Sequence, residues 1–510
     1  MRKMLPLILT LALLAGLAVP AYAAGVTPKT GSNVSARSYG GYSSRNISSY
    51  LFPNNKGGLT RVEGTTVEEY NSSFQLLNSR EIPTELNIYG GFFAGSEYNF
   101  FFFGQGNSGE SDNVEVMRVV KYSKDWQRLG QASIYGENTQ TPFRSGTLRC
   151  AEYRGVLYVH TCHTMYKSQK DGKNHQSCMM LSILESTMNY ERTVGFYVSH
   201  SFDQYVLADQ QGNLVGVDLG DAYPRGIALQ RIPDFQSVTL HEIPGAIGNN
   251  YTGICLGGLA ETTNNYVVSY LNRNSSASGG EHNYLIFADK NTLTPREVKL
   301  TAQPGATAPA VVPTGLNGGY VLWNGGNWLE PDSTLYYAAY SDDGTVGPVQ
   351  TAKAYLSPCQ PIVFNGKVVW YVTNGSIPVF YTLDASGLKA IPATAAPEAV
   401  KVAGPSKSSV PAPNSLPSSK ALLAGTIAGG SATVNGDSST PGVATSNGVA
   451  EFIGIDNPDT NKYCAICGSL LWDASKQEMN SGMWDPTHQY GICYSCEGTP
   501  AARELQSQYR

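Results

Sequence analysis

The histidines of this 510-residue chain are unevenly distributed, and four of the seven fall between residues 160 and 200. Imidazoles beside carboxylates can bind a divalent metal, or can move protons when a histidine lies next to an acid. An arginine nearby can neutralise negative charge that develops in a reaction. The candidate catalytic residues are His163, His200, Asp221 and Arg225, and the candidate ligand-binding residues of this region are His160, Tyr166, Asp171, His175, Asp203, Asp218 and Tyr223.

Three interpretations of this cluster stay open from the sequence alone. The side chains could hold a metal or another ligand, they could perform acid/base catalysis, or they could satisfy backbone groups and keep loops in shape. No spacing among them dictates one reaction. We expect His163, His175, His200, Asp218, Asp221 and Arg225 to share one pocket.

Four cysteines near the C-terminus form two Cys-x-x-Cys pairs, Cys464 with Cys467 and Cys493 with Cys496. Four thiolates arranged as two such pairs can surround one zinc ion tetrahedrally. A site with four cysteine ligands is closed, so the zinc would be structural. Two disulfides, or a redox-active pair, are the alternatives.

The segment around these cysteines resembles a zinc ribbon or a rubredoxin-type pair of knuckles over about forty residues. Gly468 directly follows the first pair and matches the tight turn of a knuckle, whereas Glu497 stands at the corresponding place after the second pair. The resemblance implies a small zinc-binding domain at residues 449–510 with all four cysteines as ligands.

The other five cysteines are Cys150, Cys162, Cys178, Cys255 and Cys359. Cys162 and Cys178 flank one connection, where neighbouring strands could bring them within bridging distance. Because five is an odd number, at least one thiol stays unpaired within one chain, and buried packing is its simplest role.

The elements that position these residues follow from a repeat. Short apolar runs begin at Phe100, Leu157, Leu214, Tyr266, Tyr320 and Val368, which gives spacings of 57, 57, 52, 54 and 48 residues by subtraction. Most runs follow a turn signal, and a further copy fits at residues 48–52. A period near fifty residues with several hairpins per unit resembles the β-propeller superfamily and predicts an all-β propeller of seven blades, with six as the alternative.

We expect this ring to span residues 24–390, with residues 26–35 completing the last blade. Within each blade the connections between the second and third strands are the long ones, and loops on a rigid scaffold concentrate binding groups. The histidine region supplies two of these predicted loops, residues 160–176 and 218–225.

Trp323 and Trp328 flank a polar Asn-Gly-Gly-Asn stretch in another predicted loop. Exposed aromatic rings beside amides and carboxylates are suited to holding a sugar, which favours a glycan ligand for this face. The alternative is that one or both tryptophans pack between blades.

The two ends of the chain differ from the repeat. Residues 1–23 combine a basic start, an apolar run and an Ala-Tyr-Ala site, which predicts a signal peptide cleaved after Ala23 and a secreted or cell-surface protein. This apolar run is shorter than the ~20 residues that a membrane-spanning helix needs, which argues against a membrane anchor, and the sequence has no other long apolar stretch. Residues 391–448 are rich in Pro, Ala, Ser, Gly and Thr and predict a disordered linker.

A formal charge of −5 and a pI near 5.9 argue against a nucleic-acid partner. The segment from Ser341 to Thr345 is similar to the Asp-box turn of sialidases, but it occurs once, so no catalytic residues follow from it. We expect a monomer that recognises an extracellular glycan or peptide. A metal-assisted polysaccharide hydrolase or lyase, with a second metal on the same face, and a structural surface protein are the alternatives.

Overall fold

A computed structural model describes residues 26–33, 46–193, 198, 200–232, 236–273, 282–300, 307–326 and 331–407, together with five short strands between residues 462 and 492. The predicted signal peptide, Trp328 and the four C-terminal cysteines lie outside the described residues. Every regular element in the described part is a β-strand, and none of its residues forms a helix that could cross a membrane.

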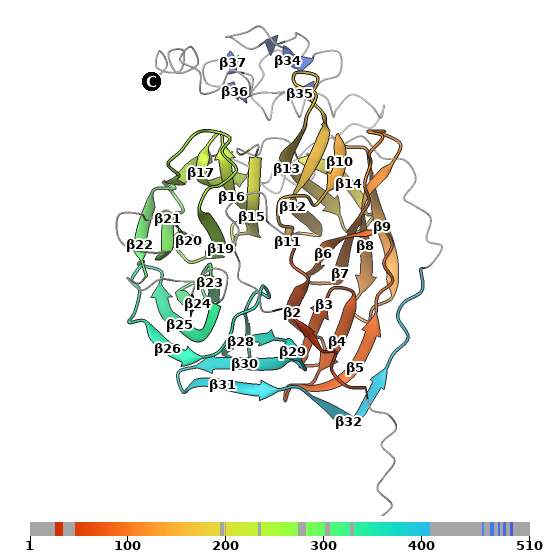
Figure 1. Ribbon diagram of the computed structural model, residues 1–510, viewed down its shortest axis with the longest axis vertical. Coiled ribbons are helices and arrows are strands. Elements are labelled where there is room, and N and C mark those ends of the chain that lie inside the picture. Colours follow the sequence, from red (N-terminus) through yellow and green to blue (C-terminus); the bar gives the residue numbers. More distant parts are fainter. Residues whose placement is uncertain are drawn as a thin grey trace, which may run out of the picture.

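Seven sheets radiate around a common centre, and the prediction of a seven-bladed β-propeller is confirmed (Figure 1). Each sheet is a four-stranded antiparallel meander in chain order, with β10 and β11 sharing the inner position of blade 3 and β32 added to blade 1. The blades are β2 (Ser49–Pro53), β3 (Leu59–Glu63), β4 (Thr66–Tyr70) and β5 (Gln75–Glu81) in blade 1; β6 (Ile88–Ala94), β7 (Tyr98–Gly104), β8 (Glu115–Ser123) and β9 (Arg128–Tyr135) in blade 2; β10 (Thr139–Pro142), β11 (Arg149–Tyr153), β12 (Val156–Lys167), β13 (Asn174–Leu184) and β14 (Asn189–Thr193) in blade 3; β15 (His200–Ala208), β16 (Leu214–Ala222), β17 (Arg225–Ile232) and β18 (Gln236–Glu242) in blade 4; β19 (Ile254–Glu261), β20 (Asn265–Asn272), β21 (His282–Asp289) and β22 (Pro295–Lys299) in blade 5; β23 (Ala310–Gly315), β24 (Gly318–Gly326), β25 (Pro331–Ser341) and β26 (Gln350–Lys353) in blade 6; and β27 (Ile362–Phe364), β28 (Lys367–Val372), β30 (Val379–Asp384) and β31 (Gly387–Pro392) in blade 7.

The apolar runs of the sequence are the second strands of blades 2 to 7. In β7, Phe100 and Phe102 belong to the core cluster shared with blade 3, whereas Phe101 and Phe103 belong to the cluster shared with blade 1. Alternate side chains of a strand point to opposite faces, and both faces of this strand meet a neighbouring blade. The strand therefore carries four consecutive apolar residues, Phe100 to Phe103. The copy predicted at residues 48–52 is the inner strand of blade 1.

One face of the ring carries the turns between first and second strands and between third and fourth strands. Side-chain acceptors stabilise these turns in the same way in several blades: in blade 4, Asp209 Oδ1 accepts the backbone N–H groups of Gln211 and Asn213 at 3.0 and 2.8 Å. Gly212 supplies the positive φ of 88° that the turn requires. The equivalent acceptors elsewhere are Asn54, Asn71, Asp289 and Asp343.

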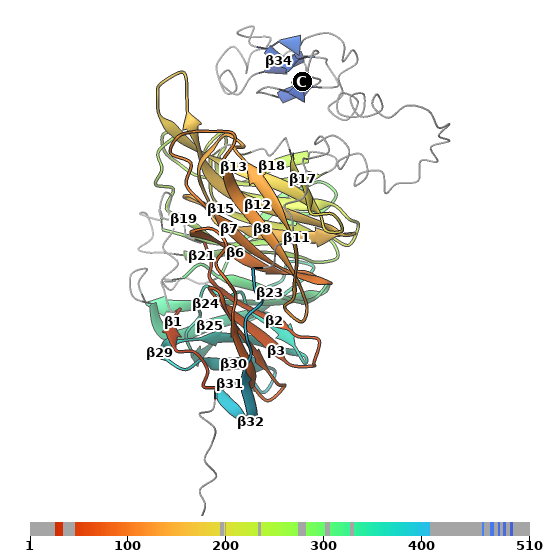
Figure 2. The ribbon, with the colours of Figure 1, turned by 90° about the vertical axis from the view of Figure 1, so that its right-hand side faces the viewer.

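The opposite face carries the ends of the hairpins between second and third strands and the crossovers between blades; we call it the hairpin face. The hairpin of β12 and β13 extends farthest from it (Figure 2). The two strands pair from Val156–Leu184 to Lys167–Asn174.

Ring closure differs from the prediction in two respects. The outer strand of blade 7 is its own β31, so residues 26–35 do not complete that blade; instead β1 (Gly31–Ser32) pairs with β29 (Asn374–Ser376). In addition β32 (Thr394–Lys401) pairs in parallel with β5 of blade 1, so the prediction of a spacer is wrong for these residues.

The N-terminal segment also contacts a buried charge network in blade 1. Arg61 and Glu68 are 1% and 0% exposed and form an ion pair with 2.6 Å between Nη1 and Oε2. The Tyr70 hydroxyl donates to the same carboxylate oxygen, and the Lys29 backbone N–H donates to the other. Residues 26–33 therefore link blade 1 to blade 7 by polar contacts as well as by strand pairing.

Candidate functional site

Most residues predicted to lie in long loops of blades 3 and 4 lie in strands. His160, His163 and His175 belong to β12 and β13, and only residues 168–173 connect these strands. Asp218, Asp221 and Arg225 belong to β16 and β17, which are joined by Tyr223 and Pro224 alone. The sequence indicated the correct end of each blade but mistook extended polar hairpins for loops.

Several of the predicted residues lie inside the ring rather than at its surface. His160 is fully buried, and its Nε2 lies 2.9 Å from Oδ1 of Asp218 in the neighbouring blade. His163, three residues farther along β12, lies on the other side of the strand, with Nδ1 2.6 Å from the Thr139 hydroxyl. Asp203 accepts a hydrogen bond of 2.9 Å from the Thr147 hydroxyl. Buried polar side chains held in this way stabilise blade 3 and its packing against blade 4.

Cys162 and Cys178 are directly opposite each other on β12 and β13, and no disulfide joins them. The Cys162 thiol donates to the carbonyl of Ser201 at 2.8 Å, and Cys178 donates to that of Val198. Burial, with the nearby Cys178 and Asp218 as smaller causes, raises the pKa of Cys162 well above its ordinary value. This thiol is therefore held as a hydrogen-bond donor and not as a nucleophilic thiolate.

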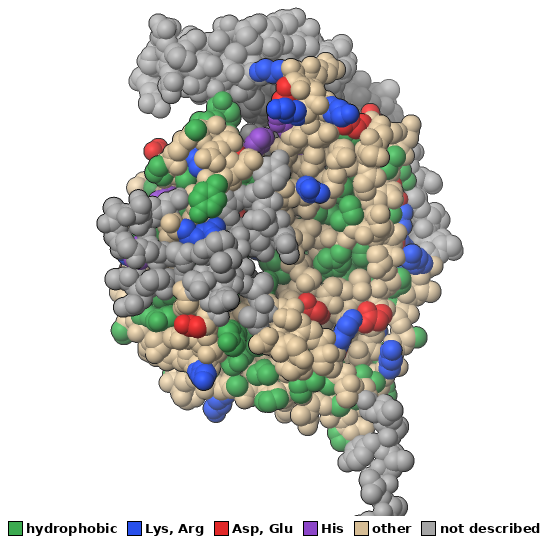
Figure 3. Space-filling model, viewed as in Figure 1, with side chains coloured by type: hydrophobic (Ala, Val, Ile, Leu, Met, Phe, Trp, Pro, Cys, Tyr) green, Lys and Arg blue, Asp and Glu red, His purple; other side chains and the backbone are tan. Residues whose placement is uncertain are grey.

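A second set of predicted residues does meet at the surface. His200 Nδ1 lies 3.4 Å from Oδ1 of Asp221, and His175 Nε2 lies 2.9 Å from Oδ2 of Asp171. The two imidazole rings are 6.4 Å apart between centroids. Their side chains are 30% and 37% exposed, and Figure 3 shows histidine side chains at the upper edge of this face. Blades 3 and 4 thus place two histidine–carboxylate pairs side by side.

The two carboxylates differ in environment. Asp171 lies at the surface, and its hydrogen bonds with the Lys173 backbone N–H and with His175 lower its pKa. Asp221 is 0% exposed, and neither of its carboxylate oxygens has a hydrogen bond with the described residues, although one lies 3.4 Å from His200. Burying a carboxylate without hydrogen-bond donors lowers the free energy of unfolding by several kcal/mol. Such a group calls for a specific role.

Arg225 does not neutralise this carboxylate. Its guanidinium donates to backbone carbonyls of the crossover between blades 4 and 5, with 2.6 Å to Asn249 O, 2.9 Å to Tyr251 O and 3.3 Å to Pro244 O. The crossover is also tied to β16 by a hydrogen bond of 3.0 Å from the Gly248 N–H to the Asp221 carbonyl. Arg225 is therefore a positioning residue for residues 244–251.

This crossover carries exposed apolar side chains that sequence reasoning missed. Tyr251 and Ile247 are 58% and 53% exposed, and Tyr223 in the adjoining β16–β17 turn is 46% exposed. A signal existed, because the segment from Pro244 to Gly253 contains three glycines and two asparagines and so predicts an exposed loop.

The remaining aromatic candidates have other roles. Trp323 is fully buried between blades 5 and 6, where it stacks on Tyr336 with 5.7 Å between ring centroids, so it does not offer a surface ring. The Tyr166 hydroxyl accepts from Asn107 at 2.9 Å and donates to Asp112 at 3.1 Å, which fixes the β12–β13 hairpin to blade 2. Among the described residues, no three or more His, Cys, Asp or Glu side chains are placed to hold one metal ion.

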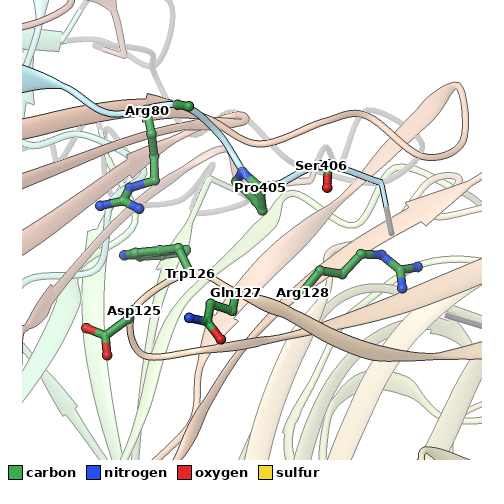
Figure 4. Close-up of a pocket in the computed structure, with 8 residues that line it drawn as sticks. Arg80, Asp125, Trp126, Gln127, Arg128, Pro405 and Ser406 are labelled. Carbon is green, nitrogen blue, oxygen red and sulfur yellow. The ribbon is translucent and has the colours of Figure 1, made fainter. Parts of the chain in front are cut away.

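A hollow of ≈ 420 Å³ also lies between blades 1 and 2, beside residues 403–406 (Figure 4). Its two arginines are already matched by carboxylates, since Arg80 lies 2.9 Å from Glu69 and Arg128 lies 2.8 Å from Glu85. Trp126, which forms one side of the hollow, is itself 3% exposed. Neither arginine therefore has a free charge, and Trp126 has little exposed ring, to offer a ligand in this hollow.

Glu185, in the third-to-fourth strand turn of blade 3, titrates abnormally. Burial, followed by repulsion from Glu152 and Glu97, raises its pKa from 4.5 to about 7. The folded protein therefore binds more protons than the unfolded chain between these values, so we expect the free energy of unfolding to decrease as the pH rises from 4.5 to 7. Glu185→Gln should remove this decrease, as measured by urea denaturation at both pH values. The exposed Glu398→Gln is the matched control, and an unchanged pH profile in Glu185→Gln would contradict the assignment.

No family model and no curated protein matches this chain. Among solved structures it is similar to the GH43 protein BlXynB of Bacillus licheniformis, with 11% identity over 58% of this chain and 66% of that one, just under two thirds of its length, and a TM-score of 0.30. It is also similar to a GH32 beta-fructofuranosidase of Bombyx mori (12% identity, 61% and 86% covered, TM-score 0.30). The propeller domain of the Trilobed protease of Pyrococcus furiosus gives 9% identity, 61% and 84% covered, and a TM-score of 0.37. The assignment of a seven-bladed propeller therefore rests on the seven sheets of this chain and not on these similarities.

Proposed function

We propose that this protein is an exported recognition propeller that binds a glycan on the hairpin face of blades 3 to 5. The observation that carries the proposal is the pair of exposed rings, Tyr223 and Tyr251, on two segments that Arg225 and Gly248 hold together. Tyrosine presents an apolar face with a polar edge, which suits the apolar side of a sugar ring.

The surroundings of the two tyrosines support a polar, neutral ligand. His200 and His175 offer ring nitrogens that can donate to or accept from hydroxyl groups, and Ile247 adds apolar contact area. Because three backbone carbonyls fix the crossover, less conformational entropy is lost when a ligand binds.

Export and the tail belong to the same proposal. A signal peptide ending at Ala23 would deliver the protein to the outside of the cell, where glycans and peptides are accessible. Zinc held by Cys464, Cys467, Cys493 and Cys496 would stabilise a small separate domain, because a site made of four thiolates is closed. A peptide is the second ligand class that this face suits.

An enzyme acting on the same polymer is the alternative, and the pairing of His200 with Asp221 favours it. A buried carboxylate beside Nδ1 can orient the ring and stabilise its charged form while Nε2 exchanges a proton with substrate. Arg225 and the buried His163 do not contribute to such a centre, because both are engaged elsewhere. The His200–Asp221 pair would therefore act without Arg225, the basic residue that the sequence suggested for this centre.

We expect Tyr223→Ala and Tyr251→Ala each to weaken glycan binding by about 5–30-fold, since loss of a stacked ring removes roughly 1–2 kcal/mol of contact energy. The measurement is binding of the full chain to an array of immobilised polysaccharides, followed by titration calorimetry on the best ligand. Tyr135→Ala, at an exposed tyrosine of β9 in blade 2 and so outside blades 3 to 5, is the matched control.

Three outcomes separate the possibilities. Binding that survives both substitutions would contradict the proposed face. Release of reducing ends that His200→Ala abolishes would establish the enzyme instead. A peptide array that responds to the same tyrosine variants would keep the face and change the ligand class.

A further inference from the structure

We propose that His175 and His200 bind one divalent transition-metal ion where blades 3 and 4 meet on the hairpin face. The proposal is independent of the glycan, because it rests on the two histidine–carboxylate pairs and is tested without any sugar. Imidazole nitrogen is a preferred ligand of Zn²⁺, Ni²⁺ and Cu²⁺, whereas Ca²⁺ and Mg²⁺ prefer oxygen.

The spacing of the two rings suits a shared ion. A ligating nitrogen lies about 2.0–2.1 Å from zinc and roughly 1.2 Å from its own ring centroid, so two imidazoles on one tetrahedral ion have centroids roughly 5.3 Å apart. The observed separation is 6.4 Å, with the rings tilted by 32°. Each ring would have to move by about half an ångström, a displacement that small χ rotations of half-exposed side chains allow.

Each imidazole has one nitrogen next to a carboxylate. His175 directs Nε2 to Asp171, and His200 directs Nδ1 to Asp221. The other nitrogen of each ring, Nδ1 of His175 and Nε2 of His200, has no hydrogen bond with the described residues. Metal-binding histidines characteristically have a carboxylate or carbonyl on the nitrogen that does not bind the metal, because this acceptor fixes the tautomer and increases the basicity of the ligand.

Asp221 supplies the independent observation. It is fully buried, and within the described part of the chain neither of its carboxylate oxygens has a hydrogen bond. A metal on Nε2 of His200 would keep the proton on Nδ1, next to this carboxylate, and would increase the positive charge of the ring. The unsatisfied carboxylate would then have a partner, so the same ion accounts for the burial of Asp221 and for its contact with His200.

Two protein ligands leave at least two positions for water or for an incoming ligand. The resulting site would be open, in contrast to the closed four-cysteine site predicted for the tail.

The test is titration calorimetry of the chelator-treated full chain with ZnCl₂ and with NiCl₂, in a background that carries Cys464→Ser, Cys467→Ser, Cys493→Ser and Cys496→Ser. We expect one equivalent to bind. His175→Ala and His200→Ala should each weaken this binding by at least tenfold. Asp221→Asn should weaken it by about 10–100-fold while leaving both ligands in place.

His241→Ala is the matched control. His241 also pairs with a carboxylate, at 3.1 Å from Glu297, but its ring contacts tyrosine and not a second imidazole. Circular dichroism of each variant verifies that it is folded. The proposal is overturned if the parent chain binds no metal, if His200→Ala or His175→Ala binds as tightly as the parent, or if His241→Ala loses binding to the same extent.

Discussion

Replacing Arg61 by methionine is expected to lower the free energy of unfolding by about 3–5 kcal/mol, because it leaves the Glu68 carboxylate buried without its counter-charge. Glu68 is 0% exposed, and Arg61 Nη1 lies 2.6 Å from it. The remaining donors, the Tyr70 hydroxyl and the Lys29 backbone N–H, are neutral. Equilibrium urea denaturation at neutral pH measures the change.

Lys56→Met is the matched control for this prediction. Lys56 also pairs with a buried glutamate, Glu69, at 3.3 Å, but the lysine side chain is 47% exposed and Arg80 contacts the same carboxylate. The expected loss is at most about 1 kcal/mol. The double variant with Arg61→Met and Glu68→Leu should recover much of the lost stability, because no unpaired charge remains. Equal losses in Arg61→Met and Lys56→Met would argue against a special role for this pair.

Trp323→Ala is expected to cost about 3–5 kcal/mol of stability, since it leaves a cavity between blades 5 and 6. The side chain is fully buried and stacked on Tyr336. Trp323→Phe keeps most of the volume and should cost clearly less. Thermal and urea unfolding of both variants measure the ranking.

The same variants decide between packing and ligand binding for Trp323. The folded fraction of Trp323→Phe should bind ligand as the parent does, because the ring is not at the surface. A variant with normal stability and lost binding would contradict the packing role.

The seven blades could be predicted because of how the second strands are buried. Phe100 to Phe103 contact a blade on each side, so all four positions are apolar, and shorter apolar runs recur in the second strands of blades 3 to 7. The turns added a second signal, since glycine at Gly212 and acceptors such as Asp209 are required by local backbone geometry.

The candidate site was less predictable, because partners across a blade interface are invisible in the sequence. His160 and Asp218 are polar residues at strand positions, and only their hydrogen bond across the interface explains how they can be buried. Read singly, they look like loop residues.

The strand β32 was missed for a similar reason. It contains Pro397 and three alanines, which resembles a linker, and it is tolerated only as the edge strand of blade 1, with a register shift between Ala395 and Val400.

The pairing of β32 with β5 has a mechanical consequence. Tension applied along the chain beyond residue 407 reaches the ring through β32, which lies parallel to β5 from Thr394–Gln75 to Lys401–Ser79. A pull along a strand loads its hydrogen bonds together in shear, whereas a pull across an edge breaks them one at a time. Blade 1 is held at the same time by the N-terminal segment through Lys29. A tether at the C-terminal side would therefore load the ring at the one blade that both ends of the propeller reinforce.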